Sequence, residues 1–205
     1  MATYLIDLSP DAMRQRLGDA LSVYVDAMRY PRGTEDQRAS MWLEHTRRRG
    51  WKAVAAVEVD VAEVDADPAR TGEPDQDFSG APLLGVAYGY CGAPDQWWQQ
   101  QVVAGLRRAG RSATEISALM NSYFELTELH INPPAQGRGL GEALTRRLLA
   151  GRAEANVLLS TPEINGEANR AWRLYRRLGF TDVIRGYHFA GDPRAFAILG
   201  RSLPL

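Results

Sequence analysis

The stretch NPPAQGRGLGEAL, residues 132–144, constrains the fold of this chain more than any other segment. It places Gly137, Gly139 and Gly141 at alternate positions, after a tandem proline and before an apolar run with helical spacing. Glycines allow the backbone of such a loop to approach a ligand closely, and the start of the helix offers N–H groups and a positive dipole end. The stretch therefore predicts a strand, a loop and a helix that hold an anion such as pyrophosphate. A tight glycine turn without a ligand is the alternative.

Two other phosphate-binding loops do not fit this spacing. A Walker A loop needs a lysine after its last glycine, and the stretch contains none. A dinucleotide fingerprint spaces its glycines G-x-G-x-x-G directly after a first strand, with an acidic residue ending the next strand. Here the glycines alternate late in the chain, and the following NVLLST segment ends in hydroxyls. A cradle of consecutive backbone N–H groups from residues 136–141 remains, to which Arg138 can add a charged contact.

The rest of the chain alternates between helical and strand patterns. Hydrophobic periodicity and turn signals predict strands at 3–8, 51–60, 82–90, 123–131, 156–161, 182–190 and 195–203, and helices at 10–29, 34–49, 94–110, 112–121, 140–151 and 169–180. Ser9 and Pro10 are typical of a helix start, and Gly50 and Gly179 of helix ends. The two adjacent tryptophans, Trp97 and Trp98, should divide between core and surface, because neighbouring helical residues face different directions.

These elements predict an α/β (α+β) fold in a single domain covering residues 1–205. The strand–loop–helix–strand segment around the glycines should be a parallel crossover, and the other links look antiparallel. We therefore expect a mixed, mostly antiparallel central sheet flanked by helices on both faces. Residues 61–80, rich in acidic residues, proline and glycine, are predicted to form a flexible acidic hairpin insertion. Residues from about 94 to 121 are predicted to form a helical insertion.

Composition excludes several classes of function. The net charge of −1 gives no global attraction to nucleic acid or membrane. A single cysteine, Cys91, rules out an internal disulfide framework and fits a reducing cytoplasm. The three histidines, His45, His130 and His188, are too far apart in sequence to suggest a zinc site. With no signal-peptide pattern and no apolar run of roughly 20 residues, we expect a cytoplasmic monomer or homodimer without a metal.

Two motifs together carry a resemblance to a known family. The segment Gln136-Gly137-Arg138-Gly139-Leu140-Gly141 resembles the Q/R-x-x-G-x-G/A signature of the GNAT superfamily of N-acetyltransferases. Downstream, AWRLYRRLGF at residues 171–180 looks like that family's A-x-x-L-Y-x-x-x-G-F segment. The two motifs occur in the family's order with one short strand between them. The resemblance covers roughly residues 123–185, and the N-terminal half is compatible by element order.

The resemblance implies that acetyl-CoA is the cosubstrate, with no metal. Its pyrophosphate would lie on the loop from Gln136 to Gly141, including Leu140. Its pantetheine would run along the preceding strand, where the backbone of Leu129, His130 and Ile131 would hold it and polarise the thioester carbonyl. Family members often carry an asparagine seven residues before the tyrosine of the second motif. That position is Ala168 here, so Asn169, one residue out of register, is the remaining candidate for this cofactor contact.

Acetyl transfer to an amine also needs a proton acceptor and a proton donor. Tyr175 matches the family's tyrosine, which implies contact with the cofactor and proton donation to the leaving thiolate; an inward-facing core tyrosine is the alternative. Glu125 and Glu128 are candidate general bases. They lie three residues apart on one strand and so face opposite sides. Counted back from the glycine loop, Glu125 falls where several members of the family have their base glutamate. Glu128 falls where other members carry an acidic or polar residue near the acceptor. The resemblance therefore favours Glu125. His130 is a further candidate, because an unperturbed imidazole has a pKa of about 6.5.

The resemblance thus implies an N-acetyltransferase that moves an acetyl group from acetyl-CoA to a primary amine by direct attack in a ternary complex. The acceptor could be a small molecule, a protein lysine or a protein N-terminus. A non-catalytic acyl-CoA-binding regulatory module is the alternative from another class. It would keep the glycine loop but would need neither Tyr175 nor a strand glutamate.

Overall fold

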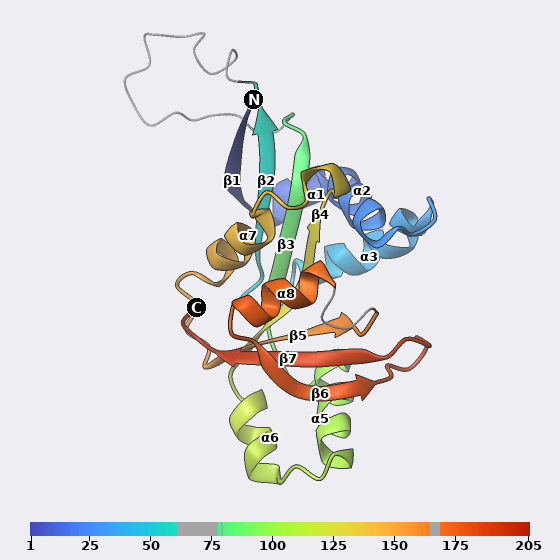
Figure 1. Ribbon diagram of the computed structural model, residues 1–205, viewed down its shortest axis with the longest axis vertical. Coiled ribbons are helices and arrows are strands. Elements are labelled where there is room, and N and C mark those ends of the chain that lie inside the picture. Colours follow the sequence, from blue (N-terminus) through green and yellow to red (C-terminus); the bar gives the residue numbers. More distant parts are fainter. Residues whose placement is uncertain (61–77, 79, 165–168) are drawn as a thin grey trace. The chain divides into compact units, whose positions relative to one another are not determined.

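The computed structural model of the protein describes residues 1–60, 78, 80–164 and 169–205 (Figure 1). The strands are β1 (Ala2–Leu8), β2 (Lys52–Val59), β3 (Leu83–Cys91), β4 (Tyr123–Ile131), β5 (Asn156–Pro162), β6 (Thr181–Tyr187) and β7 (Phe196–Ser202). The helices are α1 (Pro10–Gln15), α2 (Leu17–Met28), α3 (Thr34–His45), α5 (Trp97–Arg108), α6 (Ala113–Met120), α7 (Leu140–Leu149) and α8 (Arg170–Arg177), with a 3-10 helix η1 (Pro133–Ala135). Within these residues, no helix has the length and apolar character needed to cross a membrane.

The strands form one seven-stranded sheet in the order β1-β2-β3-β4-β5-β7-β6. The sheet is mixed, as predicted: β4 and β5 run parallel, whereas β1–β2, β5–β7 and β6–β7 are antiparallel. The parallel pair β4–β5 is joined through the glycine loop and α7, which is the predicted crossover. The predicted fold class is confirmed.

Two predicted helices differ from the structure. The helix expected over residues 10–29 is divided at Arg16, whose φ of −102° and ψ of 16° leave helical geometry. The buried Arg16 side chain donates hydrogen bonds to the carbonyls of Phe78 and Ala81, so distant backbone fixes the break. The second helix, predicted to reach residue 49, is α3 and ends at His45. Turns follow it, and Gly50 has a φ of 68°. The predicted acidic hairpin at 61–80 lies almost wholly outside the described residues.

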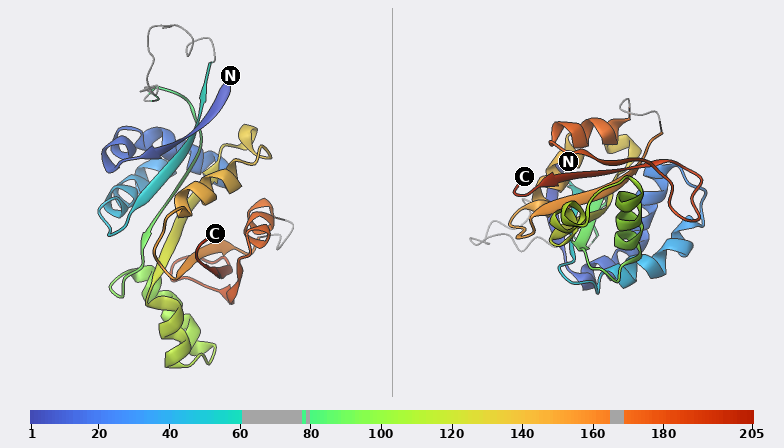
Figure 2. Two further views of the ribbon diagram at one scale, coloured as in Figure 1. Left: turned by 90° about the vertical axis from the view of Figure 1, so that its left-hand side faces the viewer. Right: turned by 90° about the horizontal axis from the view of Figure 1, so that it is seen from below.

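The chain divides into two compact units. The first unit comprises Met1–Tyr88 and Glu128–Leu148. In it, α1, α2 and α3 cover one face of the strands and α7 covers the other (Figure 2). Residues 53–57, in the middle of β2, are all buried, which explains why this part of the strand is a continuous apolar run. Helix α7 is held to β1 and β2 by an Arg147–Asp7 ion pair of 2.9 Å and by Lys52, which donates to the Arg147 carbonyl.

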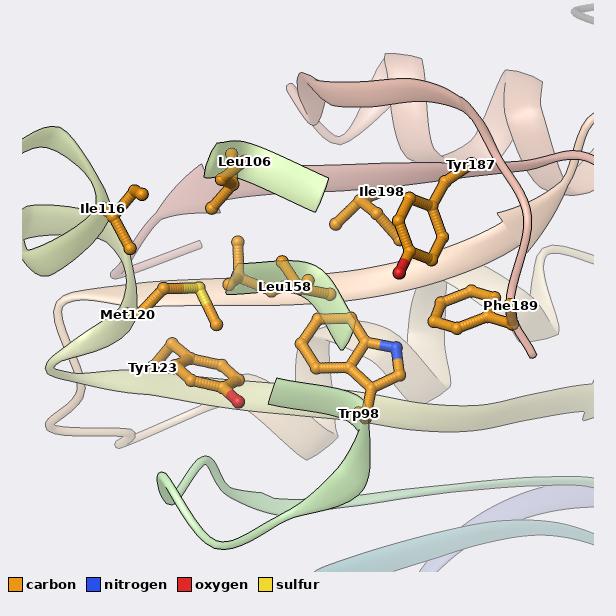
Figure 3. Packing of buried hydrophobic residues seen from close by; sticks show 10 residues of the cluster. Trp98, Leu106, Ile116, Met120, Tyr123, Leu158, Tyr187, Phe189 and Ile198 are labelled. Atoms are coloured by element: carbon orange, nitrogen blue, oxygen red, sulfur yellow. The ribbon is translucent and has the colours of Figure 1, made fainter. Parts of the chain in front are cut away.

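The second unit comprises Gly89–Thr127 and Leu149–Leu205. Here β5, β7 and β6 lie between α8 on one side and α5 with α6 on the other (Figure 1). One face of α5 and one face of α6 pack against residues of the strands and a loop (Figure 3). The helices contribute Trp98, Val102, Leu106, Ile116 and Met120, and the strands and loop contribute Tyr123, Leu158, Tyr187, Phe189 and Ile198. Trp98 is buried in this cluster, whereas Trp97 is 52 % exposed. The tryptophan pair therefore divides between core and surface as predicted.

Candidate active site

The glycine loop leaves β4 through η1, which the tandem proline begins. The Gln136 side chain folds back and donates a hydrogen bond of 3.1 Å to the Ile131 carbonyl. The backbone N–H of Asn132, the residue after Ile131, donates to the Leu84 carbonyl on β3. These two bonds fix the loop to the end of β4, so that its position follows from the strand. They also occupy the carbonyl of Ile131, one of the backbone groups predicted to lie along pantetheine.

Two of the three glycines are required by backbone conformation. Gly137 and Gly139 have φ values of 86° and 80°, a region that other residues rarely adopt. A Cβ atom built on either residue would meet no heavy atom within 4 Å. Conformation, and not crowding by the protein, therefore explains these two glycines. Gly141 lies inside α7 and does not have a positive φ.

The loop presents a row of backbone donors. The Gly139 carbonyl accepts the hydrogen bond of the Ala143 N–H at 3.1 Å, which begins the bonding of α7. Among the described residues, nothing accepts a hydrogen bond from the backbone N–H groups of residues 137–141. Consecutive unsatisfied N–H groups at a helix N-terminus, with the dipole behind them, form a site for a phosphate or pyrophosphate. The loop thus presents donors of the kind that bind phosphate groups.

The Arg138 side chain is engaged elsewhere. Its guanidinium forms an ion pair of 3.2 Å with Glu58 on β2 and donates to the Thr3 hydroxyl on β1 at 2.7 Å. A contact between Arg138 and a bound pyrophosphate, as the sequence suggests, would require the side chain to leave these partners. The backbone of the loop needs no such change.

Glu128 and His130 form one hydrogen-bonded pair. They are two residues apart on β4 and so lie on one face of the strand, with His130 Nε2 2.5 Å from Glu128 Oε2. Both side chains are largely buried, with 10 % and 17 % of the His130 and Glu128 surfaces exposed. The ring of Tyr24, on α2, meets the His130 ring edge-on at 4.9 Å. Burial, together with the nearby Glu128 carboxylate, raises the pKa of Tyr24 above its ordinary value, so this phenol stays protonated.

Glu125 has different surroundings. It belongs to the second unit and is 4 % exposed. The Tyr90 hydroxyl donates to its Oε1 at 3.3 Å, and the Thr127 hydroxyl lies 3.5 Å from the same atom. The parallel register of β4 and β5 ends at the Glu125–Leu158 pair. Within this unit the described residues Leu126 and Thr127 have no register partner on β5, so the strands part at Glu125.

Tyr175 is positioned by α8 in the second unit. It is 6 % exposed, and its ring packs against Phe180 with the ring centres 5.6 Å apart. The same helix buries Trp172, whose indole N–H donates to the Pro162 carbonyl at 3.1 Å and ties α8 to the end of β5. Tyr175 is therefore held by packing on a rigid helix.

Asn169 is the N-cap of α8. Its side-chain oxygen accepts a hydrogen bond of 2.9 Å from the Ala171 N–H. This is a sufficient structural reason for an asparagine at this position. Ala168, where family members often have asparagine, lies outside the described residues.

Sequence reasoning missed Tyr24, Tyr90 and Thr127 as neighbours of the candidate bases. Only Thr127 had a local signal, since it is two residues from Glu125 on the same strand. In the described part of the chain, no group of three or more His, Cys, Asp or Glu side chains is placed to hold a metal ion. The first unit therefore contains the loop donors and the Glu128–His130 pair, and the second unit contains Glu125 and Tyr175.

Comparisons with known proteins agree with this geometry. The family of GNAT acetyltransferase domains matches residues 95–182, which include the glycine loop and Tyr175 and also α5 and α6. The GCN5-like protein acetyltransferase Rv2170 of Mycobacterium tuberculosis is 74 % identical over 206 residues, covering 100 % of both chains.

Solved structures share the fold at low sequence identity. Arabidopsis thaliana NAA60 in complex with acetyl-CoA has a TM-score of 0.57 at 15 % identity, covering 98 % of this chain and 99 % of that one. The yncA protein of Salmonella typhimurium, solved with its cofactor acetyl-CoA, has a TM-score of 0.57 at 15 % identity, covering 100 % and 96 %. From its motifs, its fold and its close relative, the chain belongs to the GNAT superfamily of acetyltransferases.

Proposed function

We propose that this protein transfers the acetyl group of acetyl-CoA to a primary amine by direct attack in a ternary complex. The observation that carries the proposal is the run of backbone N–H groups at residues 137–141, which have no acceptor among the described residues and stand at the start of α7. A diphosphate satisfies several such donors at once. The two structural neighbours solved with acetyl-CoA support the choice of cosubstrate.

We assign the general base to the Glu128–His130 pair, with Glu125 as the alternative. A base must reach the ammonium of the acceptor, directly or through one water. The pair couples a carboxylate to an imidazole at 2.5 Å, so that the carboxylate fixes the orientation of the ring that would take the proton. Glu125 is more deeply buried and already accepts hydrogen bonds from hydroxyls. Its Oε1 is therefore already engaged, whereas the Glu128–His130 pair includes an imidazole that can take a proton.

Tyr175 is the proposed proton donor to the departing thiolate. An ordinary phenol is protonated at neutral pH, since its pKa is about 10. Its fixed position on α8 suits a donor that must meet a developing charge without rearrangement. The backbone of Leu129 and its β4 neighbours would hold pantetheine and polarise the thioester carbonyl.

For the acceptor, we propose a protein amine, either a lysine or an N-terminus. The curated relative is named a protein acetyltransferase, and this chain matches it along its whole length. Small-molecule amines are the second acceptor class. We further propose that residues 1–205 act as one cytoplasmic domain, as a monomer or homodimer, without a metal.

The decisive experiment measures thiol release from acetyl-CoA in the presence of lysine peptides, peptides with free N-termini and small amines. Acceptor-dependent release supports the transferase. Tight acetyl-CoA binding without release for any acceptor would instead favour a non-catalytic acyl-CoA-binding module. Absence of acetyl-CoA binding would contradict both functions.

A further inference from the structure

A cavity of about 330 Å³ lies between α5 and α6, and its lining includes none of the residues assigned to acetyl transfer. Gln99, Val103 and Arg107 line it from α5, where a spacing of four places them on one helix face. Ile116 and Met120 line it from α6; both belong to the packed cluster of Figure 3. The whole cavity is within the second unit. Its volume is at the low end of the range of ligand pockets, which suits a metabolite-sized molecule.

A buried amide faces this space. Gln99 is 7 % exposed, and its side-chain oxygen accepts a hydrogen bond of 3.0 Å from the Tyr123 hydroxyl. Over the described ranges, the amide nitrogen of Gln99 has no acceptor. This nitrogen is not one of the buried polar atoms that lack a partner in the described part of the chain, so it is open to solvent in the cavity and can donate to a ligand there.

The cavity also carries a cation with spare binding capacity. Arg111, on its lining, is paired with Glu115 at 2.9 Å. Arg107 is exposed and makes no ion pair, side-chain hydrogen bond or ring contact with any described residue. A guanidinium binds a carboxylate through two parallel hydrogen bonds. The wall between Arg107 and Gln99 is apolar, formed by Val103 with Ile116 and Met120.

We propose that this cavity is a binding site for a small organic carboxylate. Arg107 binds the carboxylate group, the apolar body lies against Val103, Ile116 and Met120, and Gln99 donates to an oxygen farther along the molecule. An inorganic anion would leave the apolar wall unused, and an uncharged molecule would leave Arg107 unused. The cavity lining shares no residue with the proposed acetyl-CoA site.

Calorimetric titration of the full chain with 3-phenylpropionate and hexanoate tests the proposal, with the matching amides and inorganic phosphate as comparisons. We expect saturable one-to-one binding of a carboxylate, with the amides and phosphate weaker by about tenfold or more. Arg107→Gln should weaken carboxylate binding by a similar factor. Gln99→Glu should also weaken it, since it places a like charge in the wall.

Arg108→Gln is the matched control. Arg108 is the next residue of α5, lies over the Tyr187 ring at 5.3 Å, and is not part of the cavity lining. The Arg108→Gln variant should bind the carboxylate with unchanged affinity. In a separate competition experiment, saturating acetyl-CoA should not displace the carboxylate. Three results would overturn the proposal: no saturable carboxylate binding, unchanged affinity in Arg107→Gln, or competition with acetyl-CoA. None of these results bears on acetyl transfer itself.

Discussion

The Tyr90 hydroxyl donates a hydrogen bond of 3.3 Å to the Oε1 of Glu125, and both side chains are almost fully buried. A buried carboxylate that loses such a donor is left under-satisfied. We therefore expect Tyr90→Phe to lower the free energy of unfolding by about 1–2 kcal/mol. Urea denaturation followed by circular dichroism measures the change.

Tyr4→Phe is the control for this variant. Tyr4 packs against the Phe78 ring at 5.4 Å, but its hydroxyl has no hydrogen bond with any described residue. Its removal should change stability by less than about 0.5 kcal/mol. Equal stability of the Tyr90 variant and the wild type would show that Glu125 does not depend on this donor.

The assignment of the general base predicts different effects for the two glutamates. Glu128→Gln removes the carboxylate of the proposed base pair, so turnover should fall by about 10²-fold. Glu125→Gln should have a smaller effect on turnover and a larger one on stability, because Glu125 is the more buried. Steady-state kinetics with saturating acetyl-CoA separates the two. The reverse order of kinetic effects would transfer the base role to Glu125.

The loop conformation predicts the effect of adding a side chain at Gly139. Gly139→Ala should weaken acetyl-CoA binding by about tenfold or more, since a φ of 80° is unfavourable for alanine and the N–H cradle must shift. Gly139→Glu, which adds a negative charge near the diphosphate, should abolish binding. Calorimetry measures both affinities.

Gly110→Ala separates backbone strain from ligand binding. Gly110 has a φ of 77°, and a Cβ built there meets no heavy atom within 4 Å, as at Gly139. Both alanine variants should lose about 1 kcal/mol of stability. Only the Gly139 variant should lose acetyl-CoA affinity; unchanged affinity there would remove the loop from the cofactor site.

Tyr175→Phe should lower turnover by about 10²-fold with little change in acetyl-CoA affinity, because it removes a proton donor and keeps the ring packing. Tyr187→Phe is the comparison in the same unit. Tyr187 is equally buried, and its hydroxyl donates to the Gln101 carbonyl at 2.9 Å. If both variants reduced turnover alike, general loosening of the second unit would explain the result, and Tyr175 would lose its proposed role.

His45 predicts a pH dependence of stability in the first unit. Burial, with a smaller contribution from Arg48, lowers the pKa of His45 from 6.5 to about 4. The unfolded chain therefore binds a proton between these two values that the folded protein does not bind. The stability contribution is fully present above pH 6.5 and is lost as the pH falls to about 4, by about 3 kcal/mol.

The measurement is the free energy of unfolding at pH 7.5 and pH 4.5 for His45→Gln and His188→Gln. His188 is exposed, so its variant should lose as much stability as the wild type on acidification. His45→Gln should lose less. An equal loss in both variants would mean that His45 does not titrate differently in the folded and unfolded states.

Local signals in the sequence predicted most elements of the fold. Ser9 and Pro10 begin α1 as expected, with Ser9 accepting the Ala12 N–H, and Gly179 follows α8 with a φ of 80°. The loop glycines predicted a strand–loop–helix link, because positive φ and a helix start are properties of a few consecutive residues. The Asn169 cap is also a local feature. Asn169 is a candidate for the cofactor contact only because it follows Ala168, the position where family members often carry asparagine.

Only the tertiary structure decided which side chains meet. The break at Arg16 depends on the Phe78 and Ala81 carbonyls, more than 60 residues away. Arg138, expected at the cofactor, is bound to Glu58 and Thr3 on two other strands.

Spacing along one strand could place Glu128 and His130 on the same face, but only the packing of α2 brought Tyr24 against them. The sequence by itself determined the backbone conformations and the cradle, which follow from short-range sterics and hydrogen bonding. The partners of each polar side chain depended on contacts between segments far apart in the chain, which no local pattern records.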